Sequence, residues 1–321
     1  MDKTTSLWSR EMRRLVVRHL TRLAGVLAAG LLVVGCTATS AGGAGSSSSP
    51  TTGATPTPTP NPTPTAPTYS VGTGSGDLIL KIDTGGGLVP IETLLNHLPG
   101  LALYGDGRII VPGPQAEIYP GPLLPNLRVT QITPDEIQKI MAAADQAGLL
   151  GPDASFDATG VADGPTTTFT TIVAGKTHTI SAYALGLDSQ GLDPAVTAAR
   201  EKLLDLQTRM TGLSAFLGRA VGDGTAYQPT EMRLFTAPAT NETPVNGVTP
   251  TVATWPLSAD PATAGSPARY NSNYRCLAIA GTDLATFLAA AQTANAITIW
   301  KAPSGKYSLM VRPLYPDESG C

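Results

Sequence analysis

The feature that most limits how this chain can fold is residues 37–70, a run of 34 residues with no charge and no large aliphatic side chain. It reads TATSAGGAGSSSSPTTGATPTPTPNPTPTAPTYS. Such a run cannot bury enough apolar area to offset the entropy lost on ordering. Its alternating Thr-Pro part favours extended polyproline II, at about 3.1 Å per residue. We therefore predict a disordered stalk over residues 36–72 and a folded part from Thr73 onward.

The residues before the stalk have the layout of an export signal. Six basic and only two acidic residues lie before an apolar run from Leu23 to Val34, and small residues follow it. This order of cationic, apolar and small segments is typical of a signal peptide. The apolar run of roughly a dozen residues is shorter than the 20 or so that a membrane-spanning helix needs. We therefore predict a signal peptide over residues 1–35. Arg13-Arg14 alone does not decide whether export uses the general or the twin-arginine route.

Val33-Val34-Gly35-Cys36, at the end of that apolar run, resembles the lipobox of bacterial lipoproteins. The resemblance covers only the signal and its junction. It implies that Cys36 receives a diacylglycerol, that a peptidase cuts before it, and that the protein is anchored to the extracytoplasmic face of the cell membrane. One acyl chain binds a bilayer only marginally, at about 0.8 kcal/mol per buried CH₂, whereas two or three chains such as palmitate hold durably. A soluble product cut elsewhere and an uncleaved anchor are the alternatives.

Cys276 and Cys321 are the other cysteines of the chain. Outside the cytosol an even pair is more often bridged than free, so we expect a disulfide between them rather than two separate thiols. Closing that loop removes about 4 kcal/mol of unfolded-state entropy. The bridge would also fix the C-terminal residues to the folded part.

The charge balance of the exported part indicates which partners to expect. Without the leader, the basic count is 21 − 6 = 15 and the acidic count is 24 − 2 = 22, which gives a net charge of −7. Phosphate binding needs grouped Lys and Arg, so we expect no nucleic-acid partner. The same balance argues against electrostatic adhesion to anionic lipid. The membrane is expected as a partner only through the lipid anchor.

The folded part begins with strand signals and continues with helix signals. Residues 77–82, 101–104 and 108–111 predict strands, and Gly105-Asp106-Gly107 predicts a hairpin turn that needs positive φ. Thr133-Pro134-Asp135-Glu136 predicts a helix that starts with a capping box and ends near Gly148.

Two further helices are predicted downstream. One begins at Asp193-Pro194 and another covers residues 282–295. Apolar residues recur along the first of them at alternate spacings of three and four, which is typical of packing within its own domain. They are Val196, Ala199, Leu203, Leu206, Met210, Leu213 and Leu217. Between these helices, residues 237–270 predict a surface excursion from which Trp255-Pro256-Leu257 returns to the core.

The predicted order suggests two similar halves. IQKIMAAADQAG from Ile137 aligns with LATFLAAAQTAN from Leu284, so that Gly148 faces Asn295. Each segment follows a predicted strand and precedes a predicted hairpin, at Gly175-Lys176 and at Gly305-Lys306. The alternative is that alanine-rich amphipathic helices match by chance.

The fold class expected is α+β, with antiparallel sheets and amphipathic helices packed on one face. The expected organisation is an N-terminal α+β half over residues 73–192, a connecting helix over residues 193–218 and a C-terminal α+β half over residues 219–321.

Residues suited to catalysis are few. His97 and His178 are the exported histidines, and HExxH, CxxC and GxSxG patterns are absent from the sequence. We therefore predict neither a catalytic residue nor a cofactor, and we interpret His178 as an exposed strand residue. The alternative is a hydrolase of envelope polymers, with carboxylates about 5 to 10 Å apart as acid and base. Its candidates are Asp77, Asp83, Asp106 and Glu117.

A weak calcium candidate lies in GPDASFDATGVADGP from Gly151. Asp153, Ser155, Asp157 and Asp163 supply oxygen donors, and Ca²⁺ takes six to eight of them. In a calcium loop the glycine stands at the sixth position, whereas here it falls at Gly160, and no glutamate closes the site. An Asp- and Gly-rich surface loop is therefore the default.

The expected function is that of a membrane-tethered extracytoplasmic domain that binds an envelope protein, a peptide or a glycan without catalysis. A structural component of the envelope is a further alternative. Aromatic residues could stack on a sugar or peptide, although packing is their default role. They are Tyr183, Tyr227, Tyr270, Tyr274, Trp300 and Tyr307.

Overall fold

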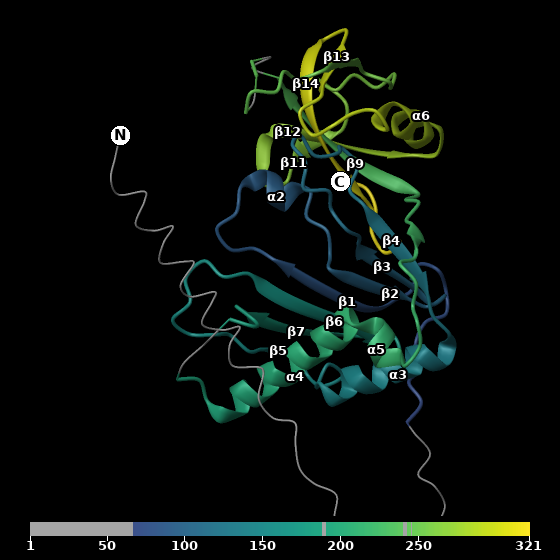
Figure 1. The fold of residues 1–321 in the computed structure, drawn as a ribbon, viewed down its shortest axis with the longest axis vertical. Helices are drawn as coiled ribbons and strands as arrows, with labels where there is room; N and C mark the ends of the chain where they lie inside the picture. Colours follow the sequence, from purple (N-terminus) through teal and green to yellow (C-terminus); the bar gives the residue numbers. More distant parts are fainter. Residues whose placement is uncertain (1–66, 188–190, 240–242, 245) are drawn as a thin grey trace, which may run out of the picture. The chain divides into compact units, whose positions relative to one another are not determined.

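The computed structural model describes residues 67–187, 191–239, 243–244 and 246–321. These residues form two β-sheets, each antiparallel apart from one parallel pair at an edge (Figure 1). The predicted α+β class is therefore confirmed. Both sheets belong to one compact unit of the chain. Over the described ranges, no helix combines the length and the apolar character needed to cross a membrane.

The larger sheet has eight strands in the order β5-β7-β6-β1-β2-β3-β4-β8. The predicted turn forms between β2 and β3, and Gly107 there has a φ of +85°. A Cβ on Gly107 would lie 2.4 Å from the carbonyl oxygen of Ile132, so only glycine fits. The strands are β1 (Leu78–Gly85), β2 (Leu101–Tyr104), β3 (Arg108–Pro112), β4 (Leu127–Gln131), β5 (Ala154–Ser155), β6 (Thr166–Val173), β7 (Lys176–Tyr183) and β8 (Thr225–Ala226).

Three helices lie on one face of this sheet, α3 (Pro134–Gln146), α4 (Pro194–Thr211) and α5 (Leu213–Leu217) (Figure 1). The predicted capping box at the start of α3 is present: Thr133 Oγ1 accepts from Glu136 N–H, and the Glu136 side chain accepts from Thr133 N–H. Gly148, with a φ of +89°, follows the end of α3 as predicted.

The helix predicted over residues 193–218 differs from the expectation in two ways. Its backbone leaves the α conformation at Gly212, so α4 and α5 are separate helices. Leu203, Leu206 and Met210 of α4 are buried in the same core as α3 and the larger sheet. The segment therefore belongs to the first half instead of linking two halves.

The smaller sheet has six strands in the order β10-β13-β14-β9-β12-β11. Its core contains Trp300 and Phe287, with ring centroids 6.0 Å apart, and Trp255, which returns to the core as predicted. The elements are α2 (Ile91–Leu95), which precedes β2 in the chain, and then β9 (Glu231–Pro238), β10 (Val252–Thr254), β11 (Ser266–Ala268), β12 (Asn271–Ala280), α6 (Gly281–Ala291), β13 (Ile299–Ala302) and β14 (Gly305–Pro313).

The sheet order gives no support to a duplication. Both halves have the predicted chain order of strand, helix and hairpin, as β4-α3-β6-β7 and β12-α6-β13-β14. In the larger sheet, however, three strands separate β4 from the hairpin and the first hairpin strand is the inner one. In the smaller sheet only β9 intervenes, and the second hairpin strand is inner. The likeness between the two halves is therefore limited to the helix match and the order of elements along the chain.

The folded part begins before the predicted boundary at Thr73. Tyr69 N–H donates to the side-chain oxygen of Gln138 at 2.7 Å, and the Gln138 amide donates to the Tyr69 carbonyl at 3.0 Å. Ser70 accepts from Ala174 N–H at 2.7 Å, and Val71 packs against the core. We assigned these residues to the stalk because they are uncharged. Composition does not show that a segment packs against a helix such as α3.

The last residues of the chain, 314–321, pack against the larger sheet on the face opposite α3 and α4. Tyr315 is 1% exposed and lies against Tyr104 and Ile110, whose side chains alternate with those that face the helices. The Tyr315 hydroxyl donates to the Pro99 carbonyl at 3.2 Å. The Asp317 carboxylate accepts from both Lys81 and Tyr104 at 2.5 Å.

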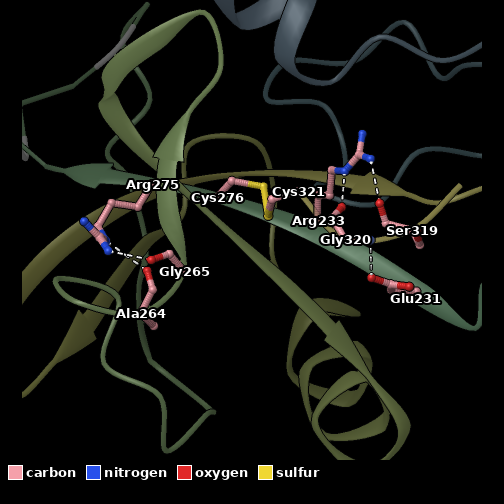
Figure 2. The surroundings of a disulfide bond; sticks show 9 residues. All are labelled: Glu231, Arg233, Ala264, Gly265, Arg275, Cys276, Ser319, Gly320 and Cys321. Carbon is pink, nitrogen blue, oxygen red and sulfur yellow. Dashed lines mark hydrogen bonds between the residues drawn. A yellow bond between two sulfur atoms is a disulfide. The ribbon is translucent and has the colours of Figure 1, made fainter.

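The same segment is bonded covalently to the smaller sheet. Figure 2 shows the disulfide between Cys321 and Cys276 of β12, which agrees with the predicted pairing. Arg233 of β9 donates to the carbonyls of Ser319 and Gly320. The C-terminal segment therefore joins β1 and β2 of one sheet to β9 and β12 of the other.

Replacing Cys276 and Cys321 together by serine should lower the free energy of unfolding by about 2 to 4 kcal/mol, as expected for a closed loop of this size. The two cysteines are 45 residues apart in sequence. Urea unfolding of the variant and of the wild type, with and without a reducing agent, measures the effect. An unchanged free energy in the variant would show that the bridge does not restrain the unfolded chain.

Candidate functional site

A groove of about 820 Å³ lies at one end of the larger sheet. One side is the helix-facing surface of β1, β2, β3 and β4, and the other is the end of α4 together with α5 and residues 221–223. We refer to it as the α5 groove. Pockets of a few hundred to about 1,000 Å³ with mainly apolar walls are the usual form of small-molecule sites.

The floor of the α5 groove is a row of side chains that crosses four strands. Ile82 pairs with Leu101, and Val111 pairs with Arg128. The register of β2 with β3, in which Leu103 lies opposite Ile109, places Leu101 opposite Val111. The row is therefore apolar across β1, β2 and β3 and ends in a cation on β4. Ile82 and Leu101 are 4% and 5% exposed, so the floor is closely packed.

The helical wall of the groove is held by polar contacts on its outer side. Met210 and Leu213 line the groove, while Lys139 of α3 donates to the Phe216 carbonyl at 2.7 Å. Arg219, just after α5, forms an ion pair with Glu136, which lowers the pKa of that carboxyl to about 2. These contacts fix α5 to α3 and therefore set the width of the groove.

The β4 end of the groove is polar. Arg128 donates from Nε to the Asp223 carbonyl at 3.1 Å and from Nη2 to the Gly224 carbonyl at 2.5 Å. Gly224 has a φ of +70°, and a Cβ there would lie 2.4 Å from the Val129 carbonyl oxygen, so this close approach needs glycine. Asn126 donates to the Pro114 carbonyl at 2.7 Å. Arg128 and Asp223 are the charged side chains among the described residues that line the groove.

The groove lining offers binding contacts and little acid–base chemistry. The described lining residues include no histidine or cysteine and a single carboxylate, that of Asp223. The Ser214 hydroxyl exchanges hydrogen bonds with the backbone of Val221, donating to its carbonyl at 3.2 Å and accepting from its N–H at 2.9 Å. An acid and a base that face one another, as general acid–base catalysis requires, are therefore not found on these walls.

A second group of ionisable side chains lies where the C-terminal segment meets the larger sheet. Arg312 donates to both oxygens of Glu318 and to the His97 carbonyl. Burial alone would raise the pKa of Glu318, but the hydrogen bonds and charge of Arg312 outweigh it and hold the pKa below its ordinary value. Burial, with the hydrogen bond to Asp317, raises the pKa of Tyr104. This cluster connects the two sheets, and its donors and acceptors are paired with one another.

None of the four carboxylates considered for a hydrolase lines the α5 groove as described, and three of them have hydrogen-bond partners of their own. Asp77 accepts from Gly74 N–H, Asp83 pairs with His97, and Asp106 pairs with Arg108. Asp77 precedes β1 and Asp83 lies within it, six residues further along, so they are about 20 Å apart. Glu117 is exposed in the connection between β3 and β4. The separation of Asp77 and Asp83 is too large for glycoside chemistry.

The weak calcium candidate does not form a cluster. Asp153 accepts from Thr179 N–H and Asp157 accepts from Tyr183 N–H, so both carboxylates satisfy the outer edge of β7. Ser155 donates to Asp157 at 2.8 Å. Within the described ranges no three His, Cys, Asp or Glu side chains are placed to hold a metal ion, and Asp163 adds no fourth donor. Pairing of a short edge strand explains the alternate spacing that suggested calcium.

His178 is buried, which corrects its interpretation as an exposed strand residue. It is 8% exposed, and its Nδ1 lies 2.6 Å from the Gly151 carbonyl oxygen. The alternation along β7 indicated which residues share a face, but the segment after α3 covers that face. Sequence periodicity alone could not show this cover.

The aromatic residues singled out for ligand stacking are mostly engaged in packing. Trp300 and Tyr307 are buried in the smaller sheet's core, and Tyr227 donates to the Leu314 carbonyl at 2.7 Å. Tyr183 contacts Gly164 and Val161, Tyr274 donates to Glu92, and Tyr270 is 52% exposed. None of the six lines the α5 groove as described. Cys36 and the predicted signal peptide lie outside the described residues.

The pair formed by His97 and Asp83 predicts a small dependence of stability on pH. The hydrogen bond to Asp83 raises the pKa of His97, while Arg312 and Glu318, which also face it, have opposite effects. A raised pKa in the folded state stabilises the protein below about pH 6.5, and this is lost as the pH rises through the folded-state pKa. The two side chains are 32% and 36% exposed, so we expect less than about 1 kcal/mol.

Urea unfolding near pH 5.5 and near pH 9 should therefore show a smaller loss of stability at high pH for Asp83→Asn than for the wild type. Equal losses in the two proteins would mean that the pair does not contribute.

Comparisons with known proteins give no relative for this chain. No protein-family model matches it, and neither the curated proteins nor the solved structures contain a match.

Proposed function

We propose that this protein is a lipid-anchored extracytoplasmic protein whose folded part binds a small, largely apolar ligand in the α5 groove without catalysing a reaction. The anchor is Cys36, acylated after export, and the uncharged segment that follows is the tether. This proposal has two parts, attachment and binding, which rest on different residues and are tested separately.

The attachment rests on the order of segments at the N-terminus. A cationic stretch, a short apolar run and Val33-Val34-Gly35-Cys36 occur in the order of a lipoprotein signal. The disulfide between Cys276 and Cys321 is consistent with an oxidising compartment outside the cytosol. These two features support a location on the outer face of the cell membrane.

The binding rests on one observation, the α5 groove with its apolar floor. It has a volume of about 820 Å³, within the range of small-molecule sites. Its strand side presents Ile82, Leu101, Ile109 and Val111, and its helical side presents Met210 and Leu213. An occupant would exchange contact with water for contact with the part of these walls that stays accessible, chiefly at Val111, which is favourable by about 25 cal/mol per Å² of apolar surface.

A hydrolase of envelope polymers is less well supported, because Asp77 and Asp83 are far apart and the groove lining has one carboxylate. A glycan or peptide ligand is also less well supported, because the aromatic side chains expected to stack on it are engaged in packing.

Filling the groove should weaken binding of a neutral apolar dye such as Nile red. Ala215 is exposed on α5 and lines the groove, so Ala215→Trp should fill it and weaken dye binding at least about ten-fold, without disturbing the core. Ala198→Trp is the matched control, because Ala198 is exposed on α4 away from the groove. Fluorescence titration of the chain from position 36, with Cys36→Ser, measures both. Equal dye affinity in the two variants would place the dye elsewhere.

Acylation of Cys36 is tested on the protein made in its own cells. We expect mass spectrometry of its N-terminal peptide to find Cys36 as the first residue with acyl chains attached, and Cys36→Ser to prevent recovery with the membrane fraction. An unmodified Cys36, or a chain that still begins at Met1, would contradict the anchor.

A further inference from the structure

We propose that the ligand of the α5 groove is a single-chain amphiphile with a carboxylate head, whose tail lies on the apolar row and whose head meets Arg128. This inference rests on the proposed binding function and names the class of ligand. It uses two features of the groove that the binding function does not need, the direction of the row and the charge at its end.

The direction follows from strand pairing. The row Ile82–Leu101–Val111–Arg128 runs perpendicular to the strands, because each residue lies opposite the next in the register. Three strand spacings of about 4.8 Å give a length of about 14 Å from the first side chain to the last. A medium-chain acyl group is of similar length and has the narrow, unbranched shape of such a track.

The head group follows from the donors at the β4 end. Nε and Nη2 of Arg128 donate to the carbonyls of Asp223 and Gly224, which fixes the plane of the guanidinium group. Nη1 has no hydrogen-bond partner in the part of the chain that the structure describes. A fixed guanidinium with a free donor matches a planar carboxylate, since charge-assisted hydrogen bonds of this kind are the stronger ones.

The negative charge of Asp223 would repel an anionic head group, so removing that charge gives a second test of the proposal. Asp223 lines the same end of the groove, and its backbone carbonyl is the group that accepts from Arg128. Asp223→Asn thus removes a negative charge and keeps the contact that orients Arg128. The exported chain has a net charge of −7 by the count above, so a preference for an anion would have to arise locally.

The test uses three probes with one tail and different heads, decanoate, decanol and decylamine, each displacing Nile red from the chain from position 36 with Cys36→Ser. We expect decanoate to bind about ten-fold more tightly than decanol, which corresponds to one charge-assisted hydrogen bond. Arg128→Gln should bring decanoate to the affinity of decanol, and Asp223→Asn should strengthen decanoate about three-fold. Decanol should be unaffected in both variants, and added salt should weaken decanoate and leave decanol unchanged.

The outcomes separate this inference from the function on which it rests. If decanol displaces Nile red and decanoate binds no more tightly than decanol, the groove binds apolar molecules. The proposal that the ligand has a carboxylate head would then be wrong. A preference for decylamine would assign the head to Asp223 instead. If none of the probes displaces Nile red, the binding function itself fails. Should Arg128→Gln unfold the β4 end, Asp223→Asn still decides, because an unchanged affinity for decanoate would overturn the assignment.

Discussion

The mismatch in width between a sheet of eight strands and the helices that cover it is the constraint from which the groove arises. Eight strands at about 4.8 Å spacing give a sheet about 34 Å wide. Two helices of about 10 Å diameter side by side cover about 20 Å. The helices α3 and α4 therefore leave part of the apolar face, and the short α5 stands over the rest at a distance set by its contacts with α3. The break at Gly212 is what turns the chain into this position.

The C-terminal segment covers the opposite face of the larger sheet. Tyr315 and the paired side chains of Arg312 and Glu318 cover it, and the disulfide at Cys321 fixes the segment to the smaller sheet. Fully removing one partner of a buried ion pair costs about 3 to 5 kcal/mol, so the chain end contributes to the integrity of both sheets. With one face closed in this way, the α5 groove is an opening on the helix-covered face of the sheet, where Val111 and Arg128 of the row are partly exposed.

Local signals in the sequence predicted local structure well. The capping box at Thr133 and the positive φ of Gly107 depend on a few neighbouring residues, and each is found. The features that no sequence pattern indicated depend on contacts between distant segments. Arg200 lies on the apolar stripe of α4, where its guanidinium donates to the carbonyls of Phe156, Tyr183 and Ala184. No pattern along the chain pairs those partners, and the burial of His178 and the docking of Tyr69 escaped prediction for the same reason.

The groove could likewise not be predicted from the sequence, because its apolar residues have the same periodicity as the residues of an ordinary core. Alternation along β1, β2 and β3 predicts which side chains share a face, but it does not predict where a helix ends above them. Arg128 is a partial exception, since a charged residue in register with an apolar row could have been noticed once the strand pairing was known. The binding site therefore follows from topology, while the anchor follows from a short linear motif.

Native mass spectrometry of the protein isolated from its own membrane, without added lipid, shows whether the α5 groove holds a ligand. We predict a fraction of molecules that carry a non-covalent ligand of small mass, released on unfolding and lost in the Ala215→Trp variant. If the wild-type protein carries no such ligand and gains none when exposed to an extract of its own envelope lipids, the proposed binding function is contradicted.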